Sequence, residues 1–354
     1  MAYTAIDNPE LYFQAKIYTG NGSTQSITLD GDTDMSPNLV WFSGRSNADD
    51  KPFFDTVRGT GEAIYSDLTN AEVSSATTLT AFDSDGFSIG NNGVVNTNTY
   101  TYVAWCWKAT GSTAANSNGT NITSTVDANT TAGFSIVSYD GTNTTSDTVG
   151  HGLSSLDFLI VKTRDETDSW CVKHKDLASG KDLRLDQTVA ETDVVNDYSE
   201  GGLANLSGNT FGFLAGTDGN AYACNEASNE HIAYCFKGVQ AFSKFGSYAT
   251  NNNADGPYIF TGFSPAFVML KVASGNTGGW DIYDNKRGFN PNEEVLQANA
   301  STAEASSDAI DLLSNGFKIR NTSGNQNGSG DTIIYMAFAE APFVNSNGVP
   351  CNAR

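Results

Sequence analysis

The chain of 354 residues carries 40 acidic and 19 basic residues, a net charge of −21. Such a surface repels phosphate groups, so the composition argues against direct binding to nucleic acid or to an anionic membrane. The length exceeds that of most single cores and indicates two or three domains. Its 35 glycines, set between short apolar runs, are typical of an all-β protein with many turns.

The first 16 residues, MAYTAIDNPELYFQAK, have neither the basic nor the apolar region of a signal peptide. No apolar stretch reaches the roughly 20 residues that a membrane helix needs. The five cysteines are odd in number and lack C-x-x-C spacing, which predicts neither a disulfide framework nor a zinc site. We expect an N-terminal arm over residues 1–16 and assembly in a reducing cytoplasm without membrane insertion.

Three similar octets close successive stretches of the chain. They read YVAWCWKA at 102–109, HIAYCFKG at 231–238 and YMAFAEAP at 335–342. In the first, the large residues Trp105 and Trp107 alternate with Ala104 and Cys106, as the two-residue period of a strand requires. We interpret each octet as the closing strand of a small β-sandwich with its large face in the core. A ligand-binding aromatic cluster is the alternative.

The same order of elements precedes every octet: a turn-bearing strand pair, an apolar strand, a third block, and a turn with an amphipathic strand. This repetition predicts an all-β fold of three tandem antiparallel β-sandwich repeats of jelly-roll or lectin-like type. The predicted parts are the arm at 1–16, repeat 1 at 17–109, a linker at 110–132, repeat 2 at 133–238, repeat 3 at 239–344 and a C-terminal tail at 345–354. The linker is predicted because Ile122 and Val126 are its only sizeable apolar residues.

Two loop motifs keep an aspartate, an arginine and a glycine at identical spacing. They are DTVRG, beginning at Asp55, and DNKRG, beginning at Asp284. We interpret each as an internal ion pair that braces a loop. The middle copy has His174 at the aspartate position and lacks the arginine, which weakens the alternative of a shared binding site.

No motif predicts catalysis, so we expect a protein that is not an enzyme. Sandwich-fold glycosidases need two carboxylates on one strand face. Asp281 and Asp284 are three residues apart and would face opposite sides. The three histidines all fall in the middle copy, and no G-x-S-x-G elbow occurs. We therefore assign no catalytic residue, and a carbohydrate-active enzyme is only a remote alternative.

No cofactor is predicted either. Asp30, Asp32 and Asp34 have the spacing of oxygen ligands in a calcium loop, but Met35 and Trp41 replace the glycine and the bidentate glutamate that the loop needs. We assign no metal residue. Whether these three aspartates hold calcium is left open by the sequence.

Several phrases together resemble a known group of repeat proteins. They are YTGNGSTQSITLDGDTDMSP, FDTVRG, LTAFDSDGFSIG, YVAWCWKA, TAGFSIVSYDG, TVGHGL, AYCF, KFGSY and YMAFAEAPF. The chain is similar to repeat-containing tail-fibre-like virion proteins of marine tailed bacteriophages. The resemblance implies a structural virion protein, most simply a short tail fibre or tail-associated adhesin that contacts the host surface. A capsid (head) decoration protein is the alternative.

The implied location is the virion, after assembly in the bacterial host cytoplasm. The implied partners are other virion proteins and a host surface glycan or receptor, and the fibre-like resemblance suggests a homotrimer. Recognition is expected in loops that differ between copies. These loops are longest in the middle repeat, and the candidate recognition residues there are Thr188, Asn209, Asp218, Asn220, Asn225 and Asn229. Deleting 218–227 is expected to leave thermal stability nearly unchanged.

Overall fold

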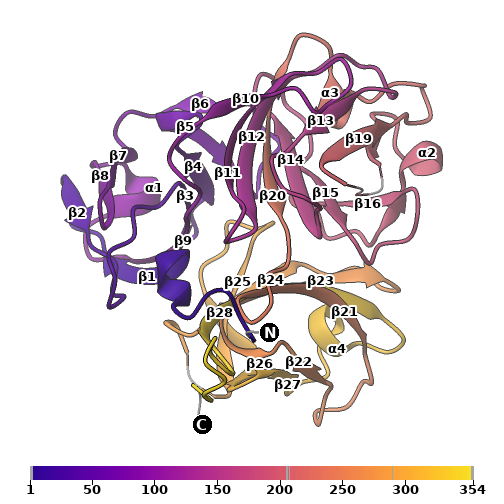
Figure 1. The fold of residues 1–354 in the computed structure, drawn as a ribbon. Coiled ribbons are helices and arrows are strands. Elements are labelled where there is room, and N and C mark those ends of the chain that lie inside the picture. Colours follow the sequence, from indigo (N-terminus) through magenta and orange to yellow (C-terminus); the bar gives the residue numbers. More distant parts are fainter. Residues whose placement is uncertain (1–2, 205, 207, 289, 352–354) are drawn as a thin grey trace.

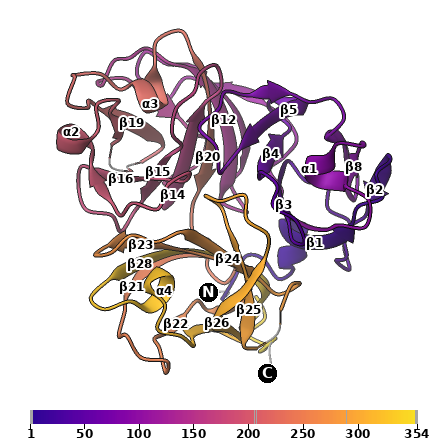
Figure 2. The same ribbon diagram turned by 180° about the vertical axis from the view of Figure 1, so that it is seen from behind.

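A computed structural model describes residues 3–204, 206, 208–288 and 290–351 (Figure 1). The described part is all-β, with antiparallel ladders between its named strands and a few helices of one turn. The strands form three successive sheet units that surround a common centre (Figures 1 and 2). We call them unit 1 (β1 to β9), unit 2 (β10 to β20) and unit 3 (β21 to β28).

Unit 1 has a six-stranded sheet of order β1-β9-β3-β4-β5-β6 and a small sheet of order β2-β8-β7. The six strands are Phe13–Thr19, Thr101–Trp107, Leu39–Gly44, Pro52–Asp55, Gly59–Tyr65 and Val73–Ser74. Those of the small sheet are Gln25–Ile27, Gly86–Ile89 and Leu79–Asp83. A 3-10 turn, η1 (Pro9–Leu11), precedes β1, and the one-turn helix α1 (Gly93–Asn96) precedes the octet strand β9.

Unit 2 has an eight-stranded sheet of order β10-β11-β12-β20-β14-β15-β16-β17 and a small sheet of order β13-β19-β18. The eight strands are Ala114–Asn116, Ser124–Asn129, Phe134–Asp140, Glu230–Phe236, Phe158–Thr163, Cys171–His174, Lys181–Arg184 and Thr192–Asp193. The small sheet comprises Thr148–Gly150, Thr210–Leu214 and Gly202–Leu203. Two one-turn helices, α2 (Val194–Asp197) and α3 (Tyr222–Asn225), complete it.

Unit 3 joins the equivalents of both sheets into one, of order β21-β28-β23-β24-β25-β26-β27-β22, which curls into a nearly closed barrel. Its strands, in that order, are Ser243–Ala249, Thr332–Pro342, Phe263–Ser274, Trp280–Asp284, Asn292–Gln297, Ala305–Leu313, Gly316–Ile319 and Tyr258–Phe260. The helix α4 (Gly324–Asn327) precedes the octet strand β28. In all three units the octet strand lies between β1, β12 or β21 on one side and the apolar strand on the other, as β1-β9-β3, β12-β20-β14 and β21-β28-β23.

The octets alternate as predicted, but their large faces do not lie where we expected. The large side chains meet at the centre of the molecule, where Trp107 contacts Phe236 of unit 2 at 6.4 Å and Phe338 of unit 3 at 5.7 Å between ring centroids. The small residues Ala104 and Cys106 instead pack in a separate core with the small sheet of unit 1. The large octet residues are buried, as predicted, but they pack in a core shared between units rather than between the two sheets of one unit.

The predicted linker at 110–132 is also wrong. Residues 124–129 form β11, which pairs with β12 along the edge of the unit 2 sheet, and β10 pairs with β11. Ile122 and Val126 are buried in the unit 2 core, so two apolar side chains anchor the segment once a neighbouring strand supplies the hydrogen bonds. The arm is shorter than predicted, because β1 already begins at Phe13. The other boundaries stay predictions.

The N-terminal arm crosses from unit 1 to unit 3 and closes the ring. The Thr4 hydroxyl donates to the carbonyl of Gln240 at 3.1 Å, and the Tyr3 hydroxyl donates to that of Gly262 at 3.4 Å. The backbone N–H of Ser346 donates to the Asp7 carboxylate at 2.7 Å, so the tail lies beside the arm. Within the described residues, no helix has the length and apolar character needed to cross a membrane.

A buried asparagine ends the one-turn helix that precedes each octet: Asn96, Asn225 and Asn327. The Asn96 side chain accepts from the backbone N–H of Asn21 at 2.8 Å and donates to the carbonyl of Gly90 at 2.6 Å. Asn327 accepts in the same way from the N–H of Asn251 at 2.8 Å. Each asparagine thus fixes the loop that follows β1, β12 or β21.

Candidate functional site

Each unit contacts the next through one repeated backbone hydrogen bond. The three donor and acceptor pairs are Glu72 N–H to the carbonyl of Arg164 at 2.7 Å, Glu191 N–H to that of Ala273 at 2.6 Å, and Glu304 N–H to that of Arg45 at 2.8 Å. These bonds join unit 1 to unit 2, unit 2 to unit 3 and unit 3 to unit 1. The three interfaces therefore have matching positions that can be compared directly.

A buried ion network occupies the interface of units 1 and 2. Arg58 Nε lies 2.6 Å from the Asp55 carboxylate within unit 1, which confirms the predicted ion pair of the DTVRG motif. Glu72 extends the network, since it binds Arg58 at 2.8 Å and Arg164 of unit 2 at 2.6 Å. Tyr234 of unit 2 donates its hydroxyl proton to Asp55 at 2.8 Å. Burial raises the pKa of Glu72, but the two arginines outweigh burial and lower it overall.

The interface of units 3 and 1 repeats this network. Arg287 Nε lies 2.6 Å from Asp284, and Glu304 binds both Arg287 at 3.0 Å and Arg45 of unit 1 at 2.7 Å. The indole N–H of Trp105, at the octet position of Tyr234, donates to Asp284 at 2.9 Å. The DNKRG motif thus also braces its loop, and it binds the neighbouring unit as well.

The interface of units 2 and 3 lacks the network. His174 and Leu177 stand at the positions of the aspartate and arginine, and Ala273 stands where the other interfaces have Arg164 and Arg45. His174 is buried, and its Nε2 has no hydrogen-bond partner among the residues that the structure describes. Burial lowers its pKa to about 4, which favours the neutral imidazole.

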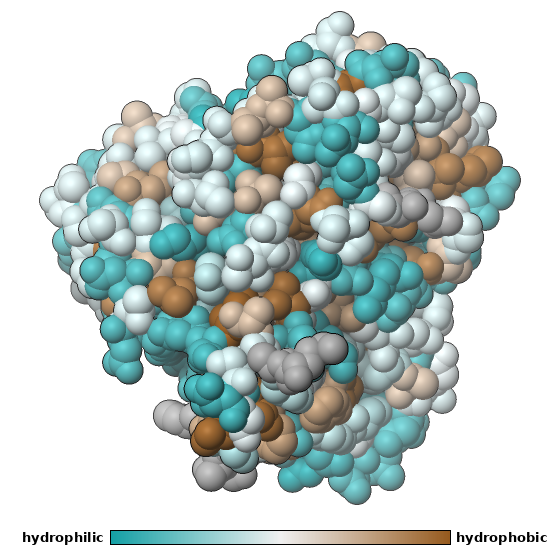
Figure 3. Space-filling view, viewed as in Figure 1, coloured by the Kyte–Doolittle hydropathy of each residue, from teal (hydrophilic) through white to brown (hydrophobic). Residues whose placement is uncertain are grey.

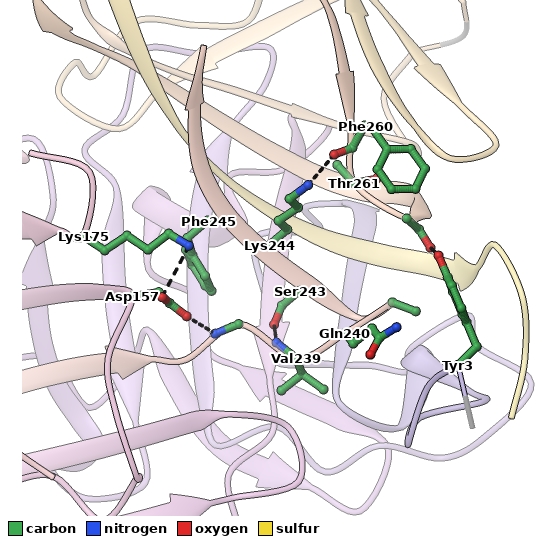
Figure 4. Close-up of a pocket in the computed structure, with 13 residues that line it drawn as sticks. Tyr3, Asp157, Lys175, Val239, Gln240, Ser243, Lys244, Phe245, Phe260 and Thr261 are labelled. Carbon is green, nitrogen blue, oxygen red and sulfur yellow. Dashed lines mark hydrogen bonds and ion pairs between the residues drawn. The ribbon is translucent and has the colours of Figure 1, made fainter. Parts of the chain in front are cut away.

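A groove of about 490 Å³ opens at this same interface (Figure 4). Unit 2 contributes Asp157 and Lys175, the chain between the units contributes residues 238–241, and unit 3 contributes Lys244 and Phe260. The Asp157 carboxylate accepts from the N–H of Gly238 at 2.6 Å and lies 3.5 Å from Lys175 Nζ. The volume falls within the 300 to 1,000 Å³ typical of small-molecule sites.

Phe260 gives the groove an exposed aromatic wall. Its side chain is 50% exposed on β22, and Lys244 Nζ lies 5.5 Å from the ring centroid. Lys244 also donates to the carbonyl of Phe260, as Figure 4 shows. A phenyl ring left in solvent next to a cation can contact both the apolar face and the charge of a ligand.

The predicted recognition residues differ in their exposure. Thr188, Asn209 and Asp218 are exposed, while Asn220 and Asn229 are partly buried. Asn225 is fully buried, donates to the carbonyl of Thr144 at 3.2 Å and accepts from the N–H of Thr142 at 3.0 Å. A surface role for Asn225 is therefore wrong, because its amide holds a loop within unit 2. None of the six lines the groove.

The expectation that residues 218–227 can be deleted without loss of stability is also contradicted. The segment contains α3, whose Ala223, Cys224 and Asn225 are buried. Removing it would open the unit 2 core. Sequence reasoning also missed the groove, since Asp157, Lys244 and Phe260 are far apart in the chain and no motif joins them.

In the described part of the chain, no group of three or more His, Cys, Asp or Glu side chains is placed to hold a metal ion. Asp30 forms an ion pair with Lys16 of β1, and the N–H of Asp32 donates to Glu10 at 3.0 Å. The described structure therefore does not gather Asp30, Asp32 and Asp34 into a calcium loop.

A family model described as a domain of unknown function, DUF7483, matches residues 8–342. No curated protein and no solved structure matches the chain. The match begins within the arm and extends to the end of the last octet, so it includes all three sheet units.

Proposed function

From the premise that the chain belongs to the DUF7483 family, a domain of unknown function, we propose that it is a structural protein of a tailed bacteriophage particle. Its most specific form is a short tail fibre or tail-associated adhesin that contacts the host surface. The proposal takes its biological setting from the resemblance to tail-fibre-like proteins of marine phages. Its partners would be other virion proteins and a host glycan or receptor.

One observation carries the non-enzymatic part of the proposal: the buried charges brace the scaffold. Asp55 and Asp284 are fully buried and bind arginines that tie one unit to the next. Asp127, also buried, accepts from the N–H groups of Thr110 at 2.8 Å and Gly111 at 2.9 Å. Carboxylates held in this way stabilise a rigid assembly, as a particle protein requires, and have no free side toward a substrate.

The surface is compatible with a protein that works outside a membrane. Figure 3 shows hydrophilic residues intermixed with small, separate apolar patches on the face that it presents. Together with the net charge of −21, this distribution favours contacts with polar partners and opposes contact with nucleic acid. No cofactor enters the proposal.

The finer architecture belongs to the same proposal. In unit 1, Ile27, Phe87 and Ile89 of the small sheet pack against Phe42 and Cys106 of the large sheet. We take each unit as a modified copy of one jelly-roll or lectin-like sandwich, with the two sheets fused in unit 3. Sandwiches of this type present loops at their ends, where an adhesin could vary its contacts.

Immunogold labelling of purified virions tests the location. Label at the tail is the expected result. Label on the capsid would favour a head decoration protein instead, and particles that carry no label would overturn the virion proposal. The homotrimer is tested separately by light scattering, which would give three times the 37.5 kDa chain mass, whereas the chain mass alone at micromolar concentration would contradict it.

The enzyme alternative needs its own measurement. Incubation of the protein with host surface polysaccharide should release no reducing ends over a day. A steady release that depends on protein concentration would establish a carbohydrate-active enzyme and overturn the binding role.

A further inference from the structure

We propose that the groove between units 2 and 3 binds a carboxylate-bearing sugar residue, with the sugar ring on Phe260 and its carboxylate at Lys244. The biological meaning of this inference rests on the proposed host-contact function, but binding can be measured on the isolated protein. The occupant is inferred from the charge, shape and exposed wall of the groove (Figure 4).

The first argument compares equivalent positions in the three units. The N–H of Lys175 donates to the carbonyl of Asp157 at 2.9 Å, and the same bond joins Thr56 to Asn38 at 2.9 Å and Asn285 to Ala266 at 3.0 Å. Of these three pairs of residues, only Asp157 and Lys175 of unit 2 have charged side chains. The equivalent place in unit 3 has a cavity of about 40 Å³, against about 490 Å³ for the groove.

The place beside Asn38 and Thr56 in unit 1 is taken up by the chain itself. The Asn38 amide donates to the Thr56 hydroxyl at 3.3 Å, and the neighbouring Gly111 is held by Asp127 of β11 at 2.9 Å. The groove is therefore not a necessary product of the repeated architecture. The groove lies beside the charged residues Asp157 and Lys175, whereas the residues at the equivalent positions of the other two units are neutral.

The second argument is charge. The groove is lined by the ammonium groups of Lys175 and Lys244 and by the Asp157 carboxylate, which lies 3.5 Å from Lys175 Nζ, so Lys244 gives it a surplus positive charge in a protein whose net charge is −21. Burial and, next, the charge of Lys175 lower the pKa of Lys244. A bound anion would offset both effects at once, because it supplies the opposite charge that the Lys244 ammonium lacks. Lysine is well suited to a carboxylate as a point charge.

The third argument is the mixture of an aromatic wall with hydrogen-bonding groups. The exposed ring of Phe260 offers an apolar face that the C–H groups of a pyranose can cover. Asp157 and Gln240 also line the groove and can accept or donate hydrogen bonds to hydroxyl groups. A groove wall that combines one aromatic ring with a few polar groups orients a small polar ligand better than a purely apolar wall does.

The test is calorimetric titration of the whole chain with three probes: a galacturonic acid trisaccharide, its methyl ester, and inorganic phosphate. The acid should bind, and the ester, which lacks the charge, should bind about tenfold more weakly, as a lost charge-assisted contact implies. Phosphate should bind more weakly than the acid because it has no face to place on Phe260. Equal binding of acid and ester, or no binding of the acid, would refute the proposal.

Two groove variants and two matched controls locate the site. Phe260→Ala and Lys244→Met should each weaken binding of the acid about tenfold. Tyr100→Ala removes another exposed aromatic side chain, 41% exposed in unit 1, and Lys108→Met removes one positive charge outside the groove, so both should bind normally. Equal loss in controls and groove variants would show that binding occurs elsewhere. Melting curves will confirm that all four variants are folded.

The outcome separates this inference from the proposed function. If virions carry the protein at the tail but the acid does not bind, the groove proposal fails and the location stands. If the acid binds and Phe260→Ala weakens binding as expected while virions carry no label, the groove stands and the virion role fails.

Discussion

At the scale of single residues, the aromatic side chains of the octets join the units. Trp105 is fully buried, donates its indole N–H to Asp284 of unit 3, and lies 5.8 Å from the ring of Phe267. A side chain in this position contributes packing and also satisfies part of a buried carboxylate. Removing the Trp105 side chain should therefore destabilise the interface between units 1 and 3.

Trp105→Ala should lower the free energy of unfolding by about 3 to 5 kcal/mol through the cavity that it leaves. Trp105→Phe retains most of the ring and should cost about 1 to 3 kcal/mol through the lost donor. Urea unfolding measures both, with Tyr100→Ala as an exposed control near zero. A cost near zero for Trp105→Phe would contradict a separate role for the indole N–H.

The three histidines predict sensitivity to acid. His151, His174 and His231 are all buried in unit 2, and burial lowers the pKa of each to about 4. Between pH 6.5 and 4 these histidines bind protons in the unfolded chain but remain mostly neutral in the folded chain. Stability must therefore fall as the pH falls through this range, and it is unaffected by these groups above pH 6.5.

His231→Tyr tests this with a residue that the other octets already carry, at Tyr102 and Tyr335. From pH 6.5 to 5, the wild type should lose roughly 2 kcal/mol more stability than the variant, since one pKa unit corresponds to about 1.4 kcal/mol. Melting curves at several pH values give both slopes. Parallel slopes would show that His231 does not titrate differently in the folded chain.

At the scale of elements, each one-turn helix that precedes an octet ends in a buried asparagine. The helices are too short to be stable alone, so their geometry depends on the contacts of Asn96, Asn225 and Asn327. The loops that they hold differ in sequence between units while the asparagine recurs. An element with little stability of its own thus determines how the ends of the sheets are presented.

Asn96→Ala and Asn327→Ala should each lower the free energy of unfolding by about 2 to 4 kcal/mol, because buried backbone groups lose their partners. Asn98→Ala, at an exposed position two residues after Asn96, should change it by less than about 0.5 kcal/mol. Chemical denaturation provides the comparison. A cost at Asn98 as large as that at Asn96 would contradict the role assigned to the buried amide.

The sequence predicts the local part of this architecture well. The two-residue alternation of the octets and the Asp55–Arg58 and Asp284–Arg287 pairs are visible because the residues involved are neighbours in the chain. The ion pairs of Glu72 with Arg164 and of Glu304 with Arg45 form only when the units associate. No short sequence pattern therefore predicts these two ion pairs. The groove was missed for the same reason. The segment at 110–132 was misjudged because its polarity concealed an edge strand.

At the scale of the whole molecule, three units share one core. The central cluster includes Trp107 of unit 1, Phe236 of unit 2 and Phe338 of unit 3. A unit separated from the other two would therefore expose the large side chains of its octet to water. Three separate chains would bury such faces by forming a trimer. Here the three units of one chain bury them against one another.

Residues 1–109, expressed alone, should not give a stable folded monomer, because Val103, Trp105 and Trp107 would be exposed together. The fragment should bind the dye ANS and lack the near-ultraviolet circular dichroism of fixed aromatic rings. The full chain should unfold in one cooperative transition. A fragment with a sharp melt and no ANS binding would show that unit 1 is an independent domain.

The unlike interfaces have a consequence for valency. A ring of three identical chains would carry any interface site three times, whereas the groove between units 2 and 3 has no equivalent of similar volume beside Ala266 and Asn285 in the described part of unit 3. Each chain then offers a single contact of this kind, and attachment is strengthened when many copies are held at a spacing that lets them engage one surface together. The density of the protein on its support, rather than the affinity of one groove, would then determine how firmly it adheres.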